Sequence, residues 1–266
     1  MLEYDFMQNA FAAAGIAAVV SGLVGYFLVL RGQTFAGHAL GHIGFAGATG
    51  AVLIGIAPIW GLVGFTVAAG VAMGVLGERI SGRDVAIGVV LALALGFGLL
   101  FLHYYTAFAT QATALLFGNV LAVDHSTIAT LLGLALLTLA ALAAIMRPLM
   151  FASLQPELAE AKGVPLNFVS IGFLVIVALA VSESAQIVGI LLVFALMVGP
   201  PATAQRLVTG LWSGVALSAV LALADAWLGI AVAYYTDWPV SFCIAMLSAL
   251  GYFLASGIAS PWRETG

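Results

Sequence analysis

Long apolar runs, separated by short polar breaks, extend over almost the whole chain. Most runs approach the ~20 residues that an α-helix needs to cross the hydrocarbon core of a bilayer. The pattern therefore predicts about nine membrane spans, at residues 9–30, 35–57, 61–77, 85–105, 127–145, 166–181, 186–202, 212–235 and 240–259. The sixth run is short and is followed by Ser182, Glu183 and Ser184, which predict a polar break before the seventh.

The basic residues support this arrangement, because cytoplasmic loops of membrane proteins are enriched in Lys and Arg. When the nine spans are threaded alternately, every basic residue falls on one side: Arg31, Arg79, Arg83, Arg147, Lys162, Arg206 and Arg263. The opposite side receives Glu3, Asp5, Asp124, Glu183 and Asp237. We therefore expect the N-terminus outside and the C-terminus in the cytoplasm. Merging the sixth and seventh spans would move Arg206 outside, which favours two spans there.

Composition agrees with a protein surrounded by the lipid bilayer. Of the 266 residues, 64% are hydrophobic and only 7% are charged, a balance unlike that of ordinary soluble domains. We predict an all-α membrane protein, a polytopic bundle of about eight or nine transmembrane helices in a single domain covering residues 1–266. No basic run is interleaved with aromatic residues, so nucleic-acid binding has no support. The nucleotide-binding pattern GxxxxGK[ST] is also absent from the sequence.

Two histidines lie inside the second predicted span, in the stretch GHALGHIGFAGATG. On a helix, the four-residue spacing of His38 and His42 puts both rings on one face. Histidines in a span are costly unless they meet polar partners or line a water-filled path, and two imidazoles can form half of a transition-metal site. The alternative is that each ring only packs between helices. Gly37 and Gly41 form a small-xxx-small pair that would let another helix approach closely.

Two acidic residues are further candidates for a metal path. Asp225 is the only carboxylate well inside a predicted span, where it could assist the histidines or be a buried, hydrogen-bonded side chain. Glu183, near the outer end of its span, could line an entrance or belong to a solvated loop. A transported ion should be held only transiently, so an incomplete ligand set suits passage better than storage.

The polar stretch LQPELAEAKGVPL predicts a short amphipathic helix at about residues 155–163 on the cytoplasmic side. Pro156 suits the first helical position, where its missing N–H costs nothing. Glu157 and Glu160 suit the positive end of the helix, Lys162 the other end, and Gly163 a stop. The helix is either an ordinary interfacial loop element or a docking element for a soluble partner.

Several stretches together resemble the integral permeases of the bacterial ABC-type importers of zinc, manganese or iron. They are YFLVLRGQTFAGHALGHIGFAGATGAVLIG, DVAIGVVLALALGFGLLFL, ALLFGNVLAVD, LQPELAEAKGVPL and GILLVFALMVGPPATAQRL, in order along most of the chain. In that family the second-span motif usually reads Gly-Asp-Ala-Leu-Ser-His, and its Asp and His are associated with the metal path. Here His42 matches the histidine, His38 occupies the aspartate position and Gly41 the serine position.

The resemblance implies a role for each part. His38 and His42 would contact a passing divalent ion, with no permanently bound cofactor. Imidazole in place of a hard carboxylate favours zinc as the first choice, with manganese or iron as alternatives. Partners would be a second copy of the chain, two ATP-binding subunits on the helix that carries Glu157, Glu160, Lys162 and Gly163, and an extracytoplasmic metal-binding protein. The chain would reside in the bacterial plasma membrane and would not itself be an enzyme.

Two other classes of function fit the sequence less well. An intramembrane metalloenzyme would need a general base, but the residues between His38 and His42 do not form an HExxH motif and no carboxylate adjoins them. An ATP-independent metal transporter or channel would not need a docking helix, and it would need more intramembrane acids than Asp225 for proton coupling.

Overall fold

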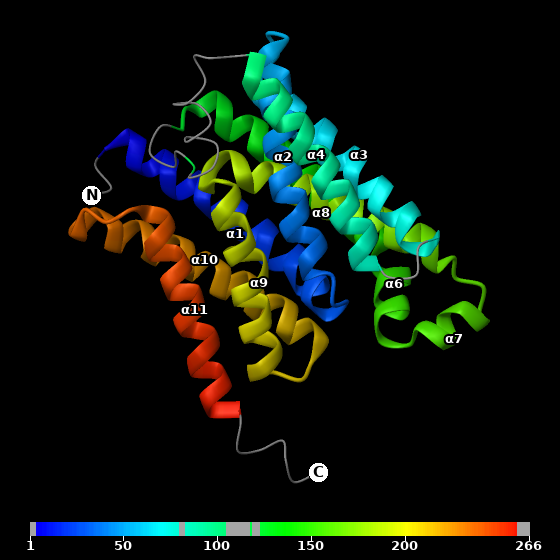
Figure 1. The fold of residues 1–266 in the computed structure, drawn as a ribbon. Helices are drawn as coiled ribbons and strands as arrows, with labels where there is room; N and C mark the ends of the chain where they lie inside the picture. Colours follow the sequence, from blue (N-terminus) through cyan, green and yellow to red (C-terminus); the bar gives the residue numbers. More distant parts are fainter. Residues whose placement is uncertain (1–3, 80–82, 105–117, 119–122, 260–266) are drawn as a thin grey trace.

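The computed structural model describes residues 4–79, 83–104, 118 and 123–259 (Figure 1). These residues form helices joined by short connections, with no strand among them. The helices are α1 (Asp5–Leu30), α2 (Thr34–Leu53), α3 (Pro58–Arg79), α4 (Arg83–Tyr104), α6 (His125–Leu154), α7 (Pro156–Ala161), α8 (Leu166–Val188), α9 (Ile190–Leu207), α10 (Leu211–Thr236) and α11 (Val240–Ala259). The all-helical prediction is therefore confirmed.

Each of the nine predicted spans corresponds to one long helix among the described residues, and α7 is the short additional one. Seven of these helices are long and apolar enough to cross a membrane, namely α1, α3, α4, α6, α8, α10 and α11. The two that do not meet this criterion are α2, which carries the histidines, and α9. A count of eight or nine spans thus stays a prediction, as does the sidedness of the termini.

The polar triplet Ser182–Glu183–Ser184 was expected to separate two spans, and this prediction is wrong. Helix α8 continues through it to Val188, and the chain turns instead at Gly189, whose φ of 85° favours glycine. The triplet stays helical because its serines face other helices. The hydroxyl of Ser182 lies 2.7 Å from that of Thr66 in α3, and the hydroxyl of Ser184 lies 2.9 Å from that of Ser21 in α1.

Two other boundaries differ from the sequence pattern. The fifth span was expected at residues 127–145, before Arg147 and Pro148, but α6 contains Pro148 and runs on to Leu154. A proline removes one backbone hydrogen bond, and a helix of 30 residues with a packed inner face can tolerate that loss. The second span ends four residues early, at Leu53, because the chain turns at Gly55 with a φ of 76° before α3 begins at Pro58.

Helices α1 and α8 lie in the interior of the bundle, and α2 packs mainly against α3 and α4 (Figure 1). The closest approach of α2 to another backbone is at Gly47, where an added Cβ would collide with the carbonyl group of Gly61 in α3. At Gly37 and Gly41 an added Cβ would instead come closest to the side chains of Leu28 and Ile190. The glycines of α2 do permit close packing, but the tightest contact is not at the predicted pair.

Candidate functional site

The histidines share one face of α2, as their spacing predicted. Their ring centroids lie 4.7 Å apart with the ring planes at 81°, so the edge of one ring meets the face of the other. Both side chains are half-buried, and so is Phe45 one turn further on. The strip of α2 that carries the rings is therefore less covered than the rest of the helix.

The first two turns of α9 pack against this strip. The ring of Phe194 lies 4.9 Å from that of His38 at 69°, and Ile190 lies next to Gly41. The turn at Gly189 thus brings the start of α9 to the level of the histidines. Sequence reasoning missed Phe194, because an apolar residue in an apolar run carries no signal for its partner.

The two predicted carboxylates are not brought to the histidines as a ligand cluster. Asp225 is half-buried in α10, which packs against α1, α9 and α11. Glu183 lies in α8, fully buried. Within the described part of the chain, no group of three or more His, Cys, Asp and Glu side chains comes together in a way that could hold a metal. In the described part of the single chain, His38 and His42 are therefore a pair that no third residue of these types joins.

Among the described residues, Glu183 is one of several buried polar side chains that lack hydrogen-bond partners, and Gln33 and Thr138 are others. Neither of its carboxyl oxygens has a hydrogen-bond partner, although the serines on both sides of it are satisfied. A buried polar group without a partner carries a free-energy cost, so such groups in native proteins call for an explanation. The buried carboxyl group of Glu183 carries this cost in the single chain.

Arg31 links the base of α2 to the region of the short helix α7. It ends the α1 helix three residues before α2 begins, and its guanidinium donates to Ser153 Oγ at 3.1 Å and to Ser170 Oγ at 2.9 Å. It also stacks over the ring of Phe173, 5.6 Å from the ring centroid. The ends of α1, α6 and α8 are thereby joined at one point. The sequence showed a basic residue at a span end but gave no sign of its partners.

Helix α7 closely matches the predicted amphipathic helix. It begins at Pro156 and ends at Ala161, with Lys162 as its C-cap and Gly163 in the left-handed region at φ 79°. Ala159 is buried, whereas the side chains of Glu157, Glu160 and Lys162 are exposed. The charged face is therefore free to meet a soluble partner.

Two features of the described structure bear on its class: the apolar helix bundle and the histidine pair within it. A pair of half-buried imidazoles lies inside a bundle of apolar helices, and an exposed charged helix lies at the end of the bundle that holds Arg31 and Lys162. Two imidazoles can bind a transition-metal ion only together with other ligands or water, so the ion can also leave. The molecule is a multi-pass α-helical membrane permease.

The chain belongs to the ABC 3 transport family, whose model matches residues 3–259. It is 30% identical over 263 residues to the manganese import system permease protein ScaB of Streptococcus parasanguinis, covering 98% of this chain and 94% of that protein. It is 28% identical over 256 residues to the manganese transport system membrane protein MntC of Halalkalibacterium halodurans, covering 96% and 88%. Membership of this family places it in the bacterial plasma membrane.

Solved structures agree with this assignment. PsaBC from Streptococcus pneumoniae, in complex with a Fab, matches with a TM-score of 0.87 at 27% identity, over 99% of this chain and 95% of that chain. A putative metal-chelate type ABC transporter in an inward-facing conformation matches with a TM-score of 0.69 at 16% identity, over 95% and 85%, which shows a shared fold. The chain is the permease of an ABC metal importer. The relatives above are named as manganese permeases. These names favour manganese, an alternative in the sequence-based prediction, over the zinc that was predicted from His38.

Proposed function

We propose that this chain is the membrane subunit of an ATP-driven importer that carries Mn²⁺ towards the cytoplasm. The observation that carries the proposal is the end-to-end similarity to permeases named for manganese import. The basic end of the bundle, which holds Arg31, Lys162 and Arg206, faces the cytoplasm because basic loops are retained there. The exposed helix α7 then lies where a soluble ATPase can reach it.

His38 and His42 form the contact point for the ion in each chain. They combine metal-binding chemistry, partial exposure and mutual proximity. The ligand set is completed by water, by backbone oxygens or by a second copy of the chain. Such a site holds Mn²⁺ weakly, because Mn²⁺ prefers oxygen ligands and lies low in the affinity order of divalent metals. Weak binding suits an ion in transit.

Coupling passes from α7 to the histidine helix through Arg31. ATPase subunits that dock on the face with Glu157, Glu160, Lys162 and Gly163 would move α7 together with the ends of α6 and α8 that flank it. The hydrogen bonds of Arg31 to Ser153 and Ser170 carry that movement to the connection between α1 and α2. The importer further comprises two permease copies, two ATPase subunits and an extracytoplasmic metal-binding protein.

Uptake of radioactive Mn²⁺ into proteoliposomes that contain the chain and its ATPase tests the proposal. The double variant His38→Ala/His42→Ala should lower uptake at least tenfold while the complex still assembles. His125→Ala is the matched control, because His125 is exposed at the first position of α6, and it should transport normally. Unchanged uptake by the double variant would reduce the pair to packing residues. Ion flux without ATP would contradict an ATP-driven importer.

Zinc remains the second candidate, and the pair of imidazoles is the observation that favours it. Imidazole suits Zn²⁺ better than Mn²⁺, and His38 stands where the family pattern has an aspartate. His38→Asp separates the two ions. If Mn²⁺ is the cargo, this variant should keep or raise Mn²⁺ uptake relative to Zn²⁺. A wild-type preference for Zn²⁺ that is lost in His38→Asp would establish zinc instead.

A further inference from the structure

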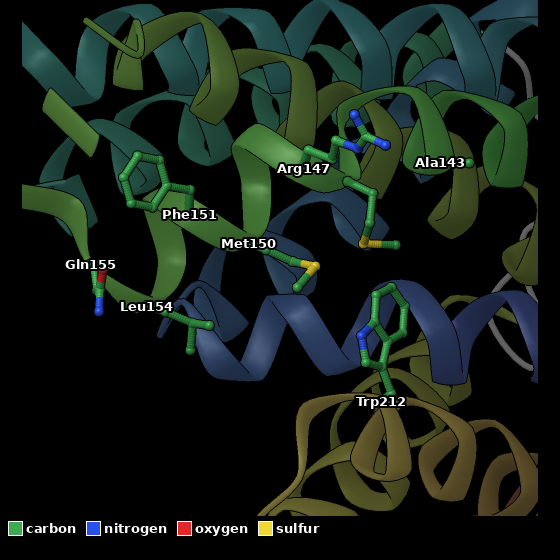
Figure 2. Close-up of a pocket in the computed structure, with 8 residues that line it drawn as sticks. Ala143, Arg147, Met150, Phe151, Leu154, Gln155 and Trp212 are labelled. Atoms are coloured by element: carbon green, nitrogen blue, oxygen red, sulfur yellow. The ribbon is translucent and has the colours of Figure 1, made fainter. Parts of the chain in front are cut away.

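Two cavities lie along α6, and each also includes residues of α10. Both α6 and α10 pack against α1. Near the basic end, a cavity of about 620 Å³ is bordered by Met146, Met150 and Leu154 of α6 and by Trp212 of α10 (Figure 2). Towards the other end, a cavity of about 370 Å³ lies between the same two helices and α1. We call these two cavities together the α6–α10 trough.

The trough changes in polarity along its length. The second cavity is lined by apolar side chains, such as Val19, Leu132 and Leu136, and by the ring of Trp227, whose indole N–H donates to the carbonyl of Phe11. The cavity at the basic end adds polar groups, the guanidinium of Arg147 and the amide of Gln155, beside the exposed indole of Trp212. A ligand that fits both parts has one polar end and a long apolar end.

Arg147 makes the polar end of the α6–α10 trough positively charged. Its side chain is exposed on α6, and among the described residues it makes no hydrogen bond or ion pair. No carboxylate lines either cavity. A guanidinium beside apolar surface and an indole is a typical environment for an anionic phosphate at the membrane interface. The arrangement leaves a positive charge for a ligand to neutralise.

The dimensions fit one leaflet of a bilayer. From Arg147 to Leu132 the helix α6 covers 15 residues, or roughly 22 Å at ~1.5 Å per residue. Half of a hydrocarbon core measures about 15 Å, so acyl chains that start at Arg147 end within the second cavity. Trp212 and Arg147 line the same cavity, at the end of the spans where the headgroups of that leaflet would be.

We propose that the α6–α10 trough binds an anionic phospholipid of the leaflet at the basic end, with its phosphate at Arg147 and its acyl chains along α6 and α10. A second copy of the chain is the other occupant that an exposed apolar trough could receive. The lipid accounts for the unpaired guanidinium and for the polarity gradient, whereas an apolar helix would leave Arg147 uncompensated. The proposal does not depend on the metal that is transported.

Lipid retention by the full-length chain tests the charge requirement. The protein is extracted from nanodiscs that contain equal amounts of phosphatidylglycerol and phosphatidylcholine, and the lipids that remain bound are counted by native mass spectrometry. The wild type should retain phosphatidylglycerol about fivefold over phosphatidylcholine, as expected for one basic residue near the membrane surface. Arg147→Gln should lose this preference and Arg147→Lys should keep most of it. Equal preference in the wild type and Arg147→Gln would overturn the proposal.

Arg206→Gln is the matched control for the loss of a charge. Arg206 lies at the same end of the bundle but outside the trough, where it donates to the hydroxyl of Tyr252. This variant should therefore keep the wild-type preference for phosphatidylglycerol. If it loses the preference as fully as Arg147→Gln does, the lipid responds to the overall charge of this end and not to the trough.

Photo-crosslinking identifies the occupant directly. Benzoylphenylalanine at position 136 in place of Leu136 projects from the wall of the second cavity, at an exposed position. In membranes containing the assembled complex, irradiation should attach phospholipid to the chain and raise its mass accordingly. A chain-to-chain adduct as the main product would show that a second copy fills the trough, and it would overturn the lipid proposal.

Discussion

Helices α8 and α6 are similarly apolar in sequence, yet they occupy opposite surroundings. In the most apolar 18-residue window of each helix, the share that is buried inside the protein is 72% for α8 and 22% for α6. Helix α8 carries Ser182, Glu183 and Ser184 within its length, whereas α6 has no charged side chain between its first residue and Arg147. Polar groups are therefore placed where other helices, and not lipid, surround them.

Helices α8 and α6 also differ in the contacts that hold them in the bundle. Helix α8 is fixed by interhelical hydroxyl pairs and by backbone contact with α3, whereas α6 presents much of its surface to the surroundings and borders the α6–α10 trough. A substitution that α6 tolerates should therefore damage α8, and a polar residue that α8 accepts should be excluded from α6.

The largest effect is expected for a charge on the exposed face of α6. Leu137 is 55% exposed and lies near the middle of the membrane-spanning part of the helix. Leu137→Asp should cost about 3 kcal/mol of insertion free energy, because a carboxylate at this depth meets lipid. The measurement is the fraction of chains inserted in the membrane, with Leu137→Phe as the apolar control. Wild-type insertion of the Asp variant would show that this face is covered in the assembly.

A smaller loss is expected for bulk added at the interface of α8 with α3. A Cβ at Gly70 would lie 2.9 Å from the carbonyl oxygen of Leu174, so Gly70→Val should lower the free energy of unfolding by about 1–3 kcal/mol. The matched change is Gly133→Val on α6, where an added Cβ meets nothing within 4 Å. Thermal midpoints in one detergent measure both. Equal losses for the two variants would contradict a difference in packing between the helices.

The hydroxyl pair that joins α8 to α1 should contribute less. The Oγ atoms of Ser21 and Ser184 lie 2.9 Å apart in the buried interface. A double-mutant cycle with Ser21→Ala, Ser184→Ala and both changes should give a coupling of about 0.6 kcal/mol, which is typical of hydrogen bonds between membrane helices. A coupling indistinguishable from zero would mean that each serine is satisfied equally well without the other.

The smallest effect concerns the exposed start of α6. Asp124 caps the helix by accepting from the backbone N–H of Thr127 and the hydroxyl of Ser126. Hydrogen bonding from the Thr127 side chain, then from the Thr127 backbone and from Ser126, lowers the pKa of Asp124 to about 2. The unfolded pKa is about 4, so the cap stabilises the fold above that pH, and its contribution is lost as the pH falls through about 2. Between pH 5 and pH 2 the thermal midpoint of Asp124→Ala should therefore fall less than that of the wild type. If the thermal midpoints of the wild type and Asp124→Ala fall equally between pH 5 and pH 2, Asp124 does not contribute to the loss of stability in acid.

Much of the fold followed from residues that act locally. The nine apolar runs predicted the long helices, and Pro156 and Gly163 predicted the bounds of α7 to within two residues. The four-residue spacing placed His38 and His42 on one face. These features depend on periodicity, on proline and glycine geometry and on the length of apolar runs. All of these are readable in a short window of sequence.

The errors have a common physical origin. The polar triplet at Ser182 suggested a loop, because the sequence does not show that Thr66 and Ser21 would satisfy its hydroxyls. The fifth span was ended at residue 145, before Arg147 and Pro148, because the sequence does not show that packing carries α6 on to Leu154. Zinc was favoured from the chemistry of His38 alone, whereas the named relatives point to manganese. In each case, information from outside the local stretch decided the outcome.

The sequence by itself determined that this protein is a bundle of membrane helices with two histidines on one helical face and a charged helix at the basic end. Only the tertiary structure decided that Phe194 covers His38, that Arg31 joins three helix ends and that Asp225 does not form a cluster with the histidines. The physical reason is that each membrane helix satisfies its own backbone hydrogen bonds. Which faces then pack together depends on shape and on a few polar contacts between apolar surfaces that are nearly equivalent in sequence.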